Sequence, residues 1–251
     1  MPPAPAIEFR NVRCALGGHT ILQNLNLGIA AGETLILFGR SGSGKTSALK
    51  LINRLYEPTS GEIFINGEPA AAADPIALRR KIGYVIQETG LFPHFTVERN
   101  IALVPHLEDW PEDRVSARVK EVLQIVGLDA AKFAARLPRE LSGGQRQRVG
   151  VARALAADPP ILLMDEPFGA LDPLTRAEIQ REFLQLQRAL AKTIIFVTHD
   201  LREALLLGTR IAVLDAGRLT GVYTPREFLS TRDALAAEYV AALRTTEIDL
   251  R

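Results

Sequence analysis

The sequence predicts an α/β fold in which a mostly parallel sheet is covered by helices on both faces. Three observations support this prediction. Short apolar runs with strand character recur along the chain, helical periodicity separates them, and a glycine-rich segment joins one such run to a helix. Wholly apolar strands that alternate with helices are typical of parallel sheets buried on both sides.

The N-terminal part of the chain has the pattern of a small β subdomain beside the central sheet. Strand-like runs cover residues 7–12, 21–29 and 34–38, with glycine-containing turns between them. Further strand-like runs at residues 62–65 and 82–86 follow the first helix. Alternating strands and tight turns of this kind favour antiparallel pairing, so we expect an N-terminal antiparallel β subdomain.

Helical periodicity dominates from about residue 97 to residue 158, where Val115, Val119 and Val122 recur at three- and four-residue spacing. Compact apolar strands then return at residues 161–164, 193–198 and 210–214. A helix between the first two of these strands carries one apolar stripe, formed by Ile179, Phe183, Leu186 and Leu190. The chain therefore reads as an α/β core interrupted by a helical insert. The predicted parts are the core over residues 1–90 and 160–220, the insert over residues 91–159, and a short helical tail over residues 221–251.

Composition excludes several classes of protein. The 251 residues include 30 Lys and Arg against 29 Asp and Glu, so a net charge of +1 gives no sign of a nucleic-acid partner or an anionic membrane. No apolar run approaches the roughly 18–20 residues needed to cross a bilayer. The N-terminus lacks the features of a signal peptide, and the single cysteine, Cys14, suits a reducing compartment. We expect a cytoplasmic protein.

A glycine-rich segment between a strand and a helix matches the pattern G-x-x-x-x-G-K-[ST]. It consists of Gly39, Arg40, Ser41, Gly42, Ser43, Gly44, Lys45 and Thr46. Its glycines allow backbone N–H groups to converge on an oxyanion, and the helix start adds a positive dipole end. Lys45 would reach the β- and γ-phosphates, and the Thr46 hydroxyl would bind Mg²⁺. The alternative is a plain glycine-rich turn, but the strand and helix around it favour a nucleoside triphosphate.

The apolar strand at residues 161–164 runs into two carboxylates, Asp165 and Glu166. Parallel strands present their carboxyl ends to the ligand crevice, which would place these acids near the glycine-rich loop. Asp165 would then hold Mg²⁺, and Glu166 would orient and deprotonate the attacking water. An acidic turn after a strand is common by itself, and the glycine-rich loop earlier in the chain is what favours the catalytic interpretation.

The segment LSGGQ opens a helix and includes Ser142, Gly143, Gly144 and Gln145. Ser142 and Gln145 have the spacing of a capping box, which any helix can use. The two glycines cost helix stability and leave backbone N–H groups accessible, as expected where the chain approaches a phosphate closely.

In this order, the glycine-rich loop, the LSGGQ segment and the Asp165–Glu166 strand end resemble the motifs of the ATP-binding cassette (ABC) proteins. The resemblance covers nearly the whole chain and implies one cassette domain over residues 6–240. It implies a RecA-like P-loop NTPase core, with the signature in a helical subdomain. ATP and Mg²⁺ are the cofactors that this resemblance implies.

The resemblance assigns roles to four further residues. Gln87 resembles the glutamine that touches Mg²⁺ or the water and senses a transmembrane partner, and His199 resembles the histidine that contacts the γ-phosphate. Asp172 resembles a residue of the D-loop, although Asp172–Pro173 is also an ordinary start of a helix. Leu16 stands where the family usually places an aromatic residue that stacks on adenine.

In this family two cassettes associate head to tail, and each ATP lies between the loop at residues 39–46 of one copy and residues 142–145 of the other. The expected partners are therefore a second copy, integral-membrane permease subunits and, indirectly, a solute-binding protein, without nucleic acid. The protein would be peripheral on the inner face of the membrane. The segment at residues 89–97 carries Leu91, Phe92 and Phe95 and would face the permease, although core packing is an alternative for the first two.

Several segments resemble the ATPase subunits of osmoprotectant importers, which move quaternary amines such as glycine betaine, carnitine or choline. These segments are residues 82–88, 90–96, 100–105 with Trp110, and 150–176. Many members of that group continue into regulatory domains, which we do not expect in a chain of 251 residues. Uptake of polar amino acids or methionine is the alternative, and a soluble cassette ATPase outside transport is a further one. A cassette does not touch the cargo, so the substrate rests on analogy.

The leucine at position 16 leads to a testable prediction. An aromatic ring stacked on a base contributes about 1–3 kcal/mol, whereas leucine offers only an apolar contact. We therefore expect modest ATP affinity and little preference for adenine over guanine. Leu16→Tyr should lower the dissociation constant for ATP, measured by calorimetric titration. An unchanged constant would contradict a role for this position in base binding.

Overall fold

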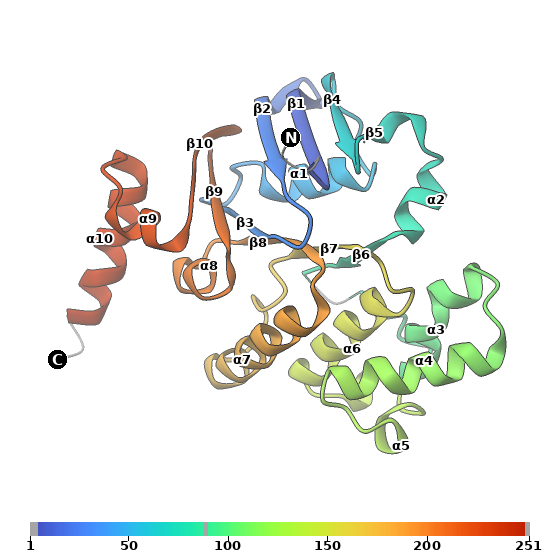
Figure 1. The fold of residues 1–251 in the computed structure, drawn as a ribbon. Coiled ribbons are helices and arrows are strands. Elements are labelled where there is room, and N and C mark those ends of the chain that lie inside the picture. The colour runs from blue at the N-terminus through green and yellow to red at the C-terminus, as the bar shows by residue number, and fades with distance from the viewer. Residues whose placement is uncertain (1–4, 88–89, 249–251) are drawn as a thin grey trace. The chain divides into compact units, whose positions relative to one another are not determined.

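The computed structural model describes residues 5–87 and 90–248, and Figure 1 traces their course. The chain forms two compact units, which comprise residues 1–72 with 195–251 (unit 1) and residues 73–194 (unit 2). No helix in the described ranges is both long and apolar enough to span a bilayer.

Unit 1 holds most of the strands. Its strands are β1 (Ile7–Leu16), β2 (His19–Ile29), β3 (Thr34–Phe38), β4 (Ser60–Ile65), β5 (Glu68–Pro69), β9 (Arg210–Asp215) and β10 (Arg218–Tyr223). Its helices are α1 (Lys45–Ile52), the 3₁₀ turn η1 (Ala70–Ala72), α8 (Leu201–Leu207), α9 (Pro225–Ser230) and α10 (Ala234–Ile248). Strand β8 (Thr193–Thr198) starts at the end of unit 2 and continues into unit 1.

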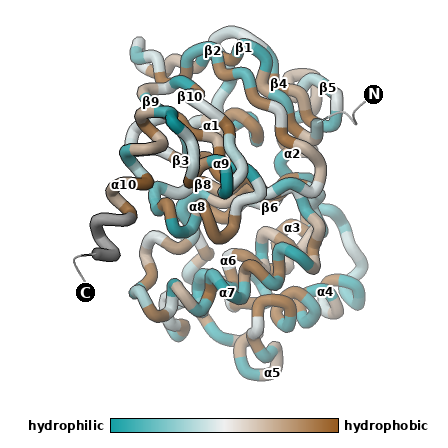
Figure 2. The backbone as a smooth tube through the Cα atoms, turned by 60° about the vertical axis from the view of Figure 1, so that its left-hand side comes forward, coloured by the Kyte–Doolittle hydropathy of each residue, from teal (hydrophilic) through white to brown (hydrophobic). Residues whose placement is uncertain are grey.

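Two kinds of strand occur in unit 1, and their burial follows their pairing. Strands β2, β1, β4 and β5 form an antiparallel sheet in that order, with Ile7 opposite both Ile29 and Ile65. Buried and exposed side chains alternate along β1 and β2, and the same alternation in hydropathy can be followed in Figure 2. Strand β3 is buried at every residue and pairs in parallel with β9. The predicted antiparallel subdomain and parallel core are confirmed.

Unit 2 is mainly helical and contains one parallel strand pair. Its elements are α2 (Pro75–Arg80), β6 (Ile82–Val85), α3 (Val97–Leu107), α4 (Glu112–Ile125), α5 (Ala130–Phe133), the 3₁₀ turn η2 (Pro138–Glu140), α6 (Gly143–Leu155), β7 (Ile161–Asp165) and α7 (Pro173–Leu190). Strands β6 and β7 run in parallel, with Ile82 opposite Ile161. The helical periodicity predicted from residue 97 is confirmed by α3, α4, α5 and α6.

The core of unit 2 comes from the apolar faces of its helices. Val115, Val119 and Val122 are buried, as their spacing predicts. On α7, Ile179 and Phe183 are buried, whereas Leu186 and Leu190 are only half-buried, so the buried part of the predicted stripe lies in the middle of the helix. Gly83 permits the close approach of β6 and α6, because a Cβ there would lie 2.4 Å from the Ala154 carbonyl oxygen.

Several elements differ from the prediction. The tail predicted from residue 221 starts with the end of β10, and its helices begin only at Pro225. Strand β10 was not predicted, since RLTGVY carries a glycine in its interior. Helix α2 was also missed, because the preceding alanines and prolines read as a loop, although Asp74 caps its start. The division into subdomains at residues 91 and 159 stays a prediction.

Candidate functional site

The glycine-rich loop lies in unit 1, between the buried strand β3 and helix α1. Two of its glycines have positive φ angles and no space for a side chain. At Gly39 (φ 151°) a Cβ would lie 2.1 Å from the Leu214 carbonyl oxygen, and at Gly44 (φ 101°) it would lie 2.6 Å from Leu22 Cδ2. Strands β9 and β2 therefore hold the backbone of the loop in a shape that only glycine can take.

The loop keeps a cation in its interior. The Lys45 side chain is buried, and its ammonium donates to the carbonyl oxygens of Gly39 (2.8 Å) and Arg40 (2.7 Å). A buried ammonium of this kind is costly unless it has acceptors, and an anionic phosphate would be a stronger partner than a carbonyl. The lysine predicted to bind phosphate is thus directed into the loop.

Two features of the loop suit an oxyanion. The Ser43 hydroxyl oxygen is buried and has no hydrogen-bond partner in the described residues. Helix α1 begins at Lys45, and its N-cap residue, Gly44, has no side chain that could cap the helix start. An anion at this helix start would satisfy backbone N–H donors and the helix dipole together. Thr46, predicted as a Mg²⁺ ligand, is half-buried in the first turn.

His199 and Leu16 are the other predicted site residues of unit 1. The turn at His199 is stabilised by the hydroxyl of the preceding residue, Thr198. This hydroxyl accepts a hydrogen bond from the Asp200 N–H at 3.0 Å and donates one to the Glu203 carboxylate at 2.5 Å. His199 itself is exposed. Leu16 is 37% exposed at the end of β1, just before the turn to β2. The bracing by Thr198 and Glu203 escaped sequence analysis.

Strand β7 in unit 2 brings two predicted residues to one loop. Asp165 is the buried last residue of the strand, and Glu166 follows it with φ 43°. A non-glycine residue in this region stores about 1 kcal/mol or more of strain, which occurs often at functional sites. Gln87 follows β6, the strand paired with β7, and its amide nitrogen lies 3.5 Å from Glu166 Oε2. The parallel pairing thus explains how residues 79 positions apart meet.

The LSGGQ segment starts α6 with the predicted capping box. Ser142 Oγ accepts from the Gln145 N–H at 3.2 Å, and Gln145 Oε1 accepts from the Ser142 N–H at 2.9 Å. Gly144 has a packing reason as well, because a Cβ there would lie 2.7 Å from Thr175 Cγ2 on α7. Gly143 has more room, with Leu171 Cδ2 3.7 Å from the position of a Cβ. The helix start is therefore capped by side chains, while Gly143 is exposed and would tolerate a Cβ.

Asp172 caps α7, and its Oδ1 accepts from the Thr175 N–H at 3.1 Å. Hydrogen bonds from the Thr175 side chain and backbone hold the pKa of this exposed carboxyl below its usual value. The structural role of Asp172 as a helix cap is thus present, and its role in the D-loop stays a prediction.

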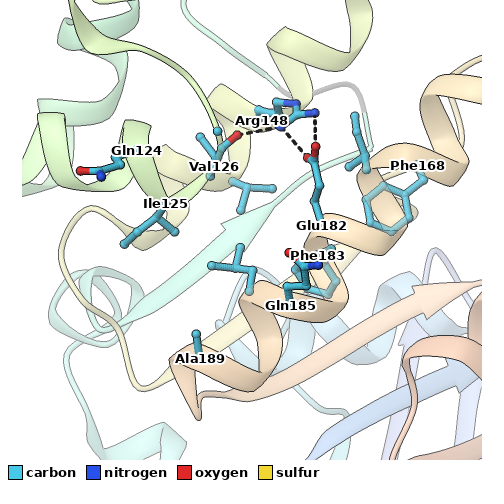
Figure 3. Close-up of a pocket in the computed structure, with 13 residues that line it drawn as sticks. Gln124, Ile125, Val126, Arg148, Phe168, Glu182, Phe183, Gln185 and Ala189 are labelled. Carbon is cyan, nitrogen blue, oxygen red and sulfur yellow. Dashed lines mark hydrogen bonds and ion pairs between the residues drawn. The ribbon is translucent and has the colours of Figure 1, made fainter.

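The lining of a cavity of about 430 Å³ in unit 2, drawn in Figure 3, includes none of the predicted site residues. Its wall comes from α4, α6, α7 and the residues between them, and it is mostly apolar. The charged groups there are largely matched, because Arg148 donates to Glu182 (2.8 Å) and to the Val126 carbonyl (2.9 Å). A triphosphate would lose its hydration there without gaining a free cation, so this cavity does not suit a nucleotide.

The predicted site residues divide between the units. The glycine-rich loop, Leu16 and His199 lie in unit 1, whereas Gln87, Asp165, Glu166, Asp172 and the LSGGQ segment lie in unit 2. Within unit 1 the structure explains the shape of the loop, and within unit 2 it brings Gln87 and Glu166 together. In proteins Mg²⁺ usually binds one or two carboxylates and completes its coordination shell with phosphate oxygens and water. These preferences fit a set of ligands that includes the Asp165 carboxylate.

A P-loop between a buried strand and a helix, an LSGGQ helix start and a strand that ends in Asp-Glu define a cassette ATPase fold. The profile of the ABC transporter family matches residues 22–169, and the chain belongs to that family.

Curated relatives narrow the comparison. The chain is 55% identical to the glycine betaine/carnitine/choline transport ATP-binding protein OpuCA of Bacillus subtilis over 213 residues, which is 85% of this chain and 56% of that protein. It is 47% identical to the glycine betaine uptake system ATP-binding protein YehX of Escherichia coli, over 89% of this chain and 72% of that protein. The chain spans little more than half the length of several relatives, including OpuCA.

Solved structures agree in fold. The post-hydrolysis dimer of the cassette MJ0796, bound to ADP and Pi, superposes with a TM-score of 0.77 at 36% identity, over 88% of this chain and 99% of that one. The structure of cbiO1 from Clostridium perfringens, part of the transporter complex cbiONQ, has a TM-score of 0.84 at 26% identity, over 99% of this chain and 100% of that one.

The placement of Lys45 leads to a prediction for binding. Hydrogen bonds to a charged group contribute about 1.5–3 kcal/mol, so Lys45→Ala should raise the dissociation constant for ATP by about 10- to 100-fold. Calorimetric titration of the purified protein measures this constant. Lys50→Ala is the matched control, since Lys50 lies in the last turn of the same helix, where it stacks over Tyr56. Equal affinities in the two variants would remove Lys45 from the phosphate site.

Proposed function

We propose that this chain binds and hydrolyses ATP and so energises a membrane ABC importer for quaternary amine osmoprotectants. The observation that carries the ATPase part is the loop at residues 39–46, where a buried lysine and an unpartnered buried hydroxyl line a backbone that only glycine permits. Membership of the ABC transporter family supports the transport part.

The proposed roles follow from the chemistry of each side chain. The glycine-rich loop binds the phosphates, with Lys45 as the cation that contacts the β- and γ-phosphates. Thr46, Gln87 and Asp165 would hold Mg²⁺, which would neutralise charge on the phosphates. Glu166 orients and deprotonates the attacking water, and Gln87, within 3.5 Å, helps to place it. His199 contacts the γ-phosphate.

A second copy would complete each nucleotide site. In a head-to-tail dimer, residues Ser142–Gln145 of one copy would cover the triphosphate held by the loop of the other. The dimeric cassettes described for MJ0796 support such an arrangement. Contacts to the γ-phosphate would then favour the closed dimer, and hydrolysis of ATP would allow the dimer to open.

A groove of about 350 Å³ in unit 2 supports a permease partner. Its lining comes from α2, β6, α3 and α6 and from described residues between β6 and α3, and it includes Tyr84, Phe92 and Arg153. Phe92 is 40% exposed, and the side chain of the buried Asn100 forms hydrogen bonds with the backbone of Phe92 and Phe95. Arg153 also donates to the Gly90 carbonyl at 2.7 Å. A partly apolar groove is suited to bind a helix of a membrane subunit. Thr89, the start of the predicted segment, lies outside the described residues.

The cargo is proposed from the relatives. The relatives named above transport glycine betaine, carnitine or choline according to their names. A sulfate/thiosulfate import protein of Bradyrhizobium diazoefficiens is also 45% identical, so the cassette itself limits the cargo only weakly. Import of amino acids or methionine and a soluble ATPase outside transport are the alternatives.

Glu166→Gln tests the hydrolytic step. General-base help contributes about 10²- to 10⁴-fold, so release of phosphate should fall at least ~10²-fold while ATP binding is retained. Phosphate release and ATP titration on the same preparation measure both. Glu121→Gln is the control, because Glu121 pairs with Arg118 on the surface of α4 and should leave both values unchanged. Retained turnover in Glu166→Gln would exclude Glu166 as the base.

Phe92→Asp tests the transport assignment in cells that express the chain with its permease and a solute-binding protein. When the permease covers the groove, the new carboxylate would lose its hydration without gaining an ion-pair partner. We therefore expect loss of both co-purification and glycine betaine uptake. Leu107→Asp, at an exposed site at the end of α3, is the control and should retain both. Uptake of amino acids alone would favour the first alternative, and failure of the wild type to co-purify would favour the second.

A further inference from the structure

The C-terminal helices of unit 1 contact the glycine-rich loop on both sides of Gly39. Phe38, the buried residue just before the loop, contacts the Phe228 ring of α9 edge-on at a centroid distance of 5.9 Å. The Tyr239 ring of α10 lies closer, at 4.7 Å. With Tyr223, which contacts Phe228 at 5.7 Å, these rings form what we call the tail cluster: Phe38, Tyr223, Phe228 and Tyr239.

The residue beside Tyr239 on the same helix reaches the loop itself. Glu238 Oε1 lies 3.1 Å from Arg40 Nη2, and it is the only carboxylate that bonds Arg40 among the residues that the structure describes. The carbonyl oxygen of Arg40 in turn accepts from the Lys45 ammonium at 2.7 Å and from the Ser43 N–H at 3.2 Å. A chain of direct contacts therefore runs from α10 through Arg40 to the phosphate-binding lysine.

The two contacts differ in physical character. The tail cluster is a packed aromatic contact against a fully buried ring, so it resists salt. The Arg40–Glu238 pair is exposed, with 64% and 65% of the side chains accessible, and an exposed pair weakens as salt screens it. Helix α10 is therefore held by a packed aromatic contact at the end of β3 and by a salt-sensitive ion pair with the glycine-rich loop.

We propose that α10 is a positioning element of the nucleotide site, in which Tyr239 fixes the end of β3 through Phe38 and Glu238 fixes Arg40. Both residues act through others and touch no phosphate, so their effect is on the conformation that the loop presents to ATP. The inference deepens the proposed function and rests on it, since it assumes that the loop binds ATP.

The sharpest test replaces the two residues separately. Tyr239→Ala should raise the KM for ATP about 2- to 10-fold with little change in kcat, because an aromatic pair is lost behind a loop that binds the ground state and the transition state alike. Tyr239→Phe keeps the ring and should restore the KM of the wild type. Tyr56→Ala removes a ring of the same unit outside the tail cluster and is the matched control. A merely structural defect would instead lower kcat through the loss of folded protein.

Substitutions of Glu238 distinguish a positioning role of its carboxylate from simple repulsion of the triphosphate. Glu238→Ala should raise the dissociation constant for ATP by up to about fivefold at low salt, and the ratio to the wild type should approach one in about 1 M salt. Glu238→Gln retains an oxygen that can accept from Arg40 and should fall between the wild type and Glu238→Ala. If the carboxylate only repelled the triphosphate, both variants would bind ATP more tightly. Glu8→Ala, which removes the exposed Arg10–Glu8 pair on β1, controls for the charge change.

The outcomes distinguish the two proposals. Wild-type affinity and KM in both Tyr239→Ala and Glu238→Ala, or tighter binding in both Glu238 variants, would overturn the role of α10 and leave the proposed function intact. Absence of ATP binding by the wild type would overturn the proposed function and this inference together.

Discussion

The close packing where β3 turns into α1 is the constraint on which the proposed nucleotide site depends. The Leu214 carbonyl of β9 blocks a side chain at Gly39, and at Gly44 the Leu22 side chain of β2 lies close while a φ of 101° disfavours any residue except glycine. The loop therefore takes its shape from the sheet around it and not from its own hydrogen bonds alone. A loop shaped in this way needs little reorganisation when it binds phosphate, which favours affinity.

Lys45 places a positive charge in the interior of this loop. Two backbone carbonyls keep its buried ammonium satisfied, so the protein tolerates a cation in its interior. In the proposed site a phosphate would compete with these carbonyls, and the affinity for ATP would depend on the difference between the two sets of bonds. One of the carbonyls belongs to Arg40, whose side chain reaches α10, so the position of the C-terminal helix enters the same balance.

In unit 2, residues proposed for chemistry also hold the fold. Ser142 and Gln145 cap α6, Asp172 caps α7, and Gly144 lets the two helices approach. Glu166 has a strained backbone next to the end of a fully buried strand. Substitutions at the caps would therefore change stability and activity together, whereas Glu166→Gln keeps shape and volume and isolates the chemical role.

The sequence by itself determined the α/β class, the P-loop, the acidic strand end and the capping box, because these depend on periodicity and on spacing along a few neighbouring residues. Tertiary structure alone decided contacts between distant segments. The Arg40–Glu238 pair joins residues 198 positions apart, and no local pattern specifies it. The packing reason for Gly144 was equally invisible, since it lies in Thr175 on another helix. Strand β10 was missed for a different reason: the glycine in its interior weakens its strand pattern, although the strand pairs with its neighbour in the chain, β9.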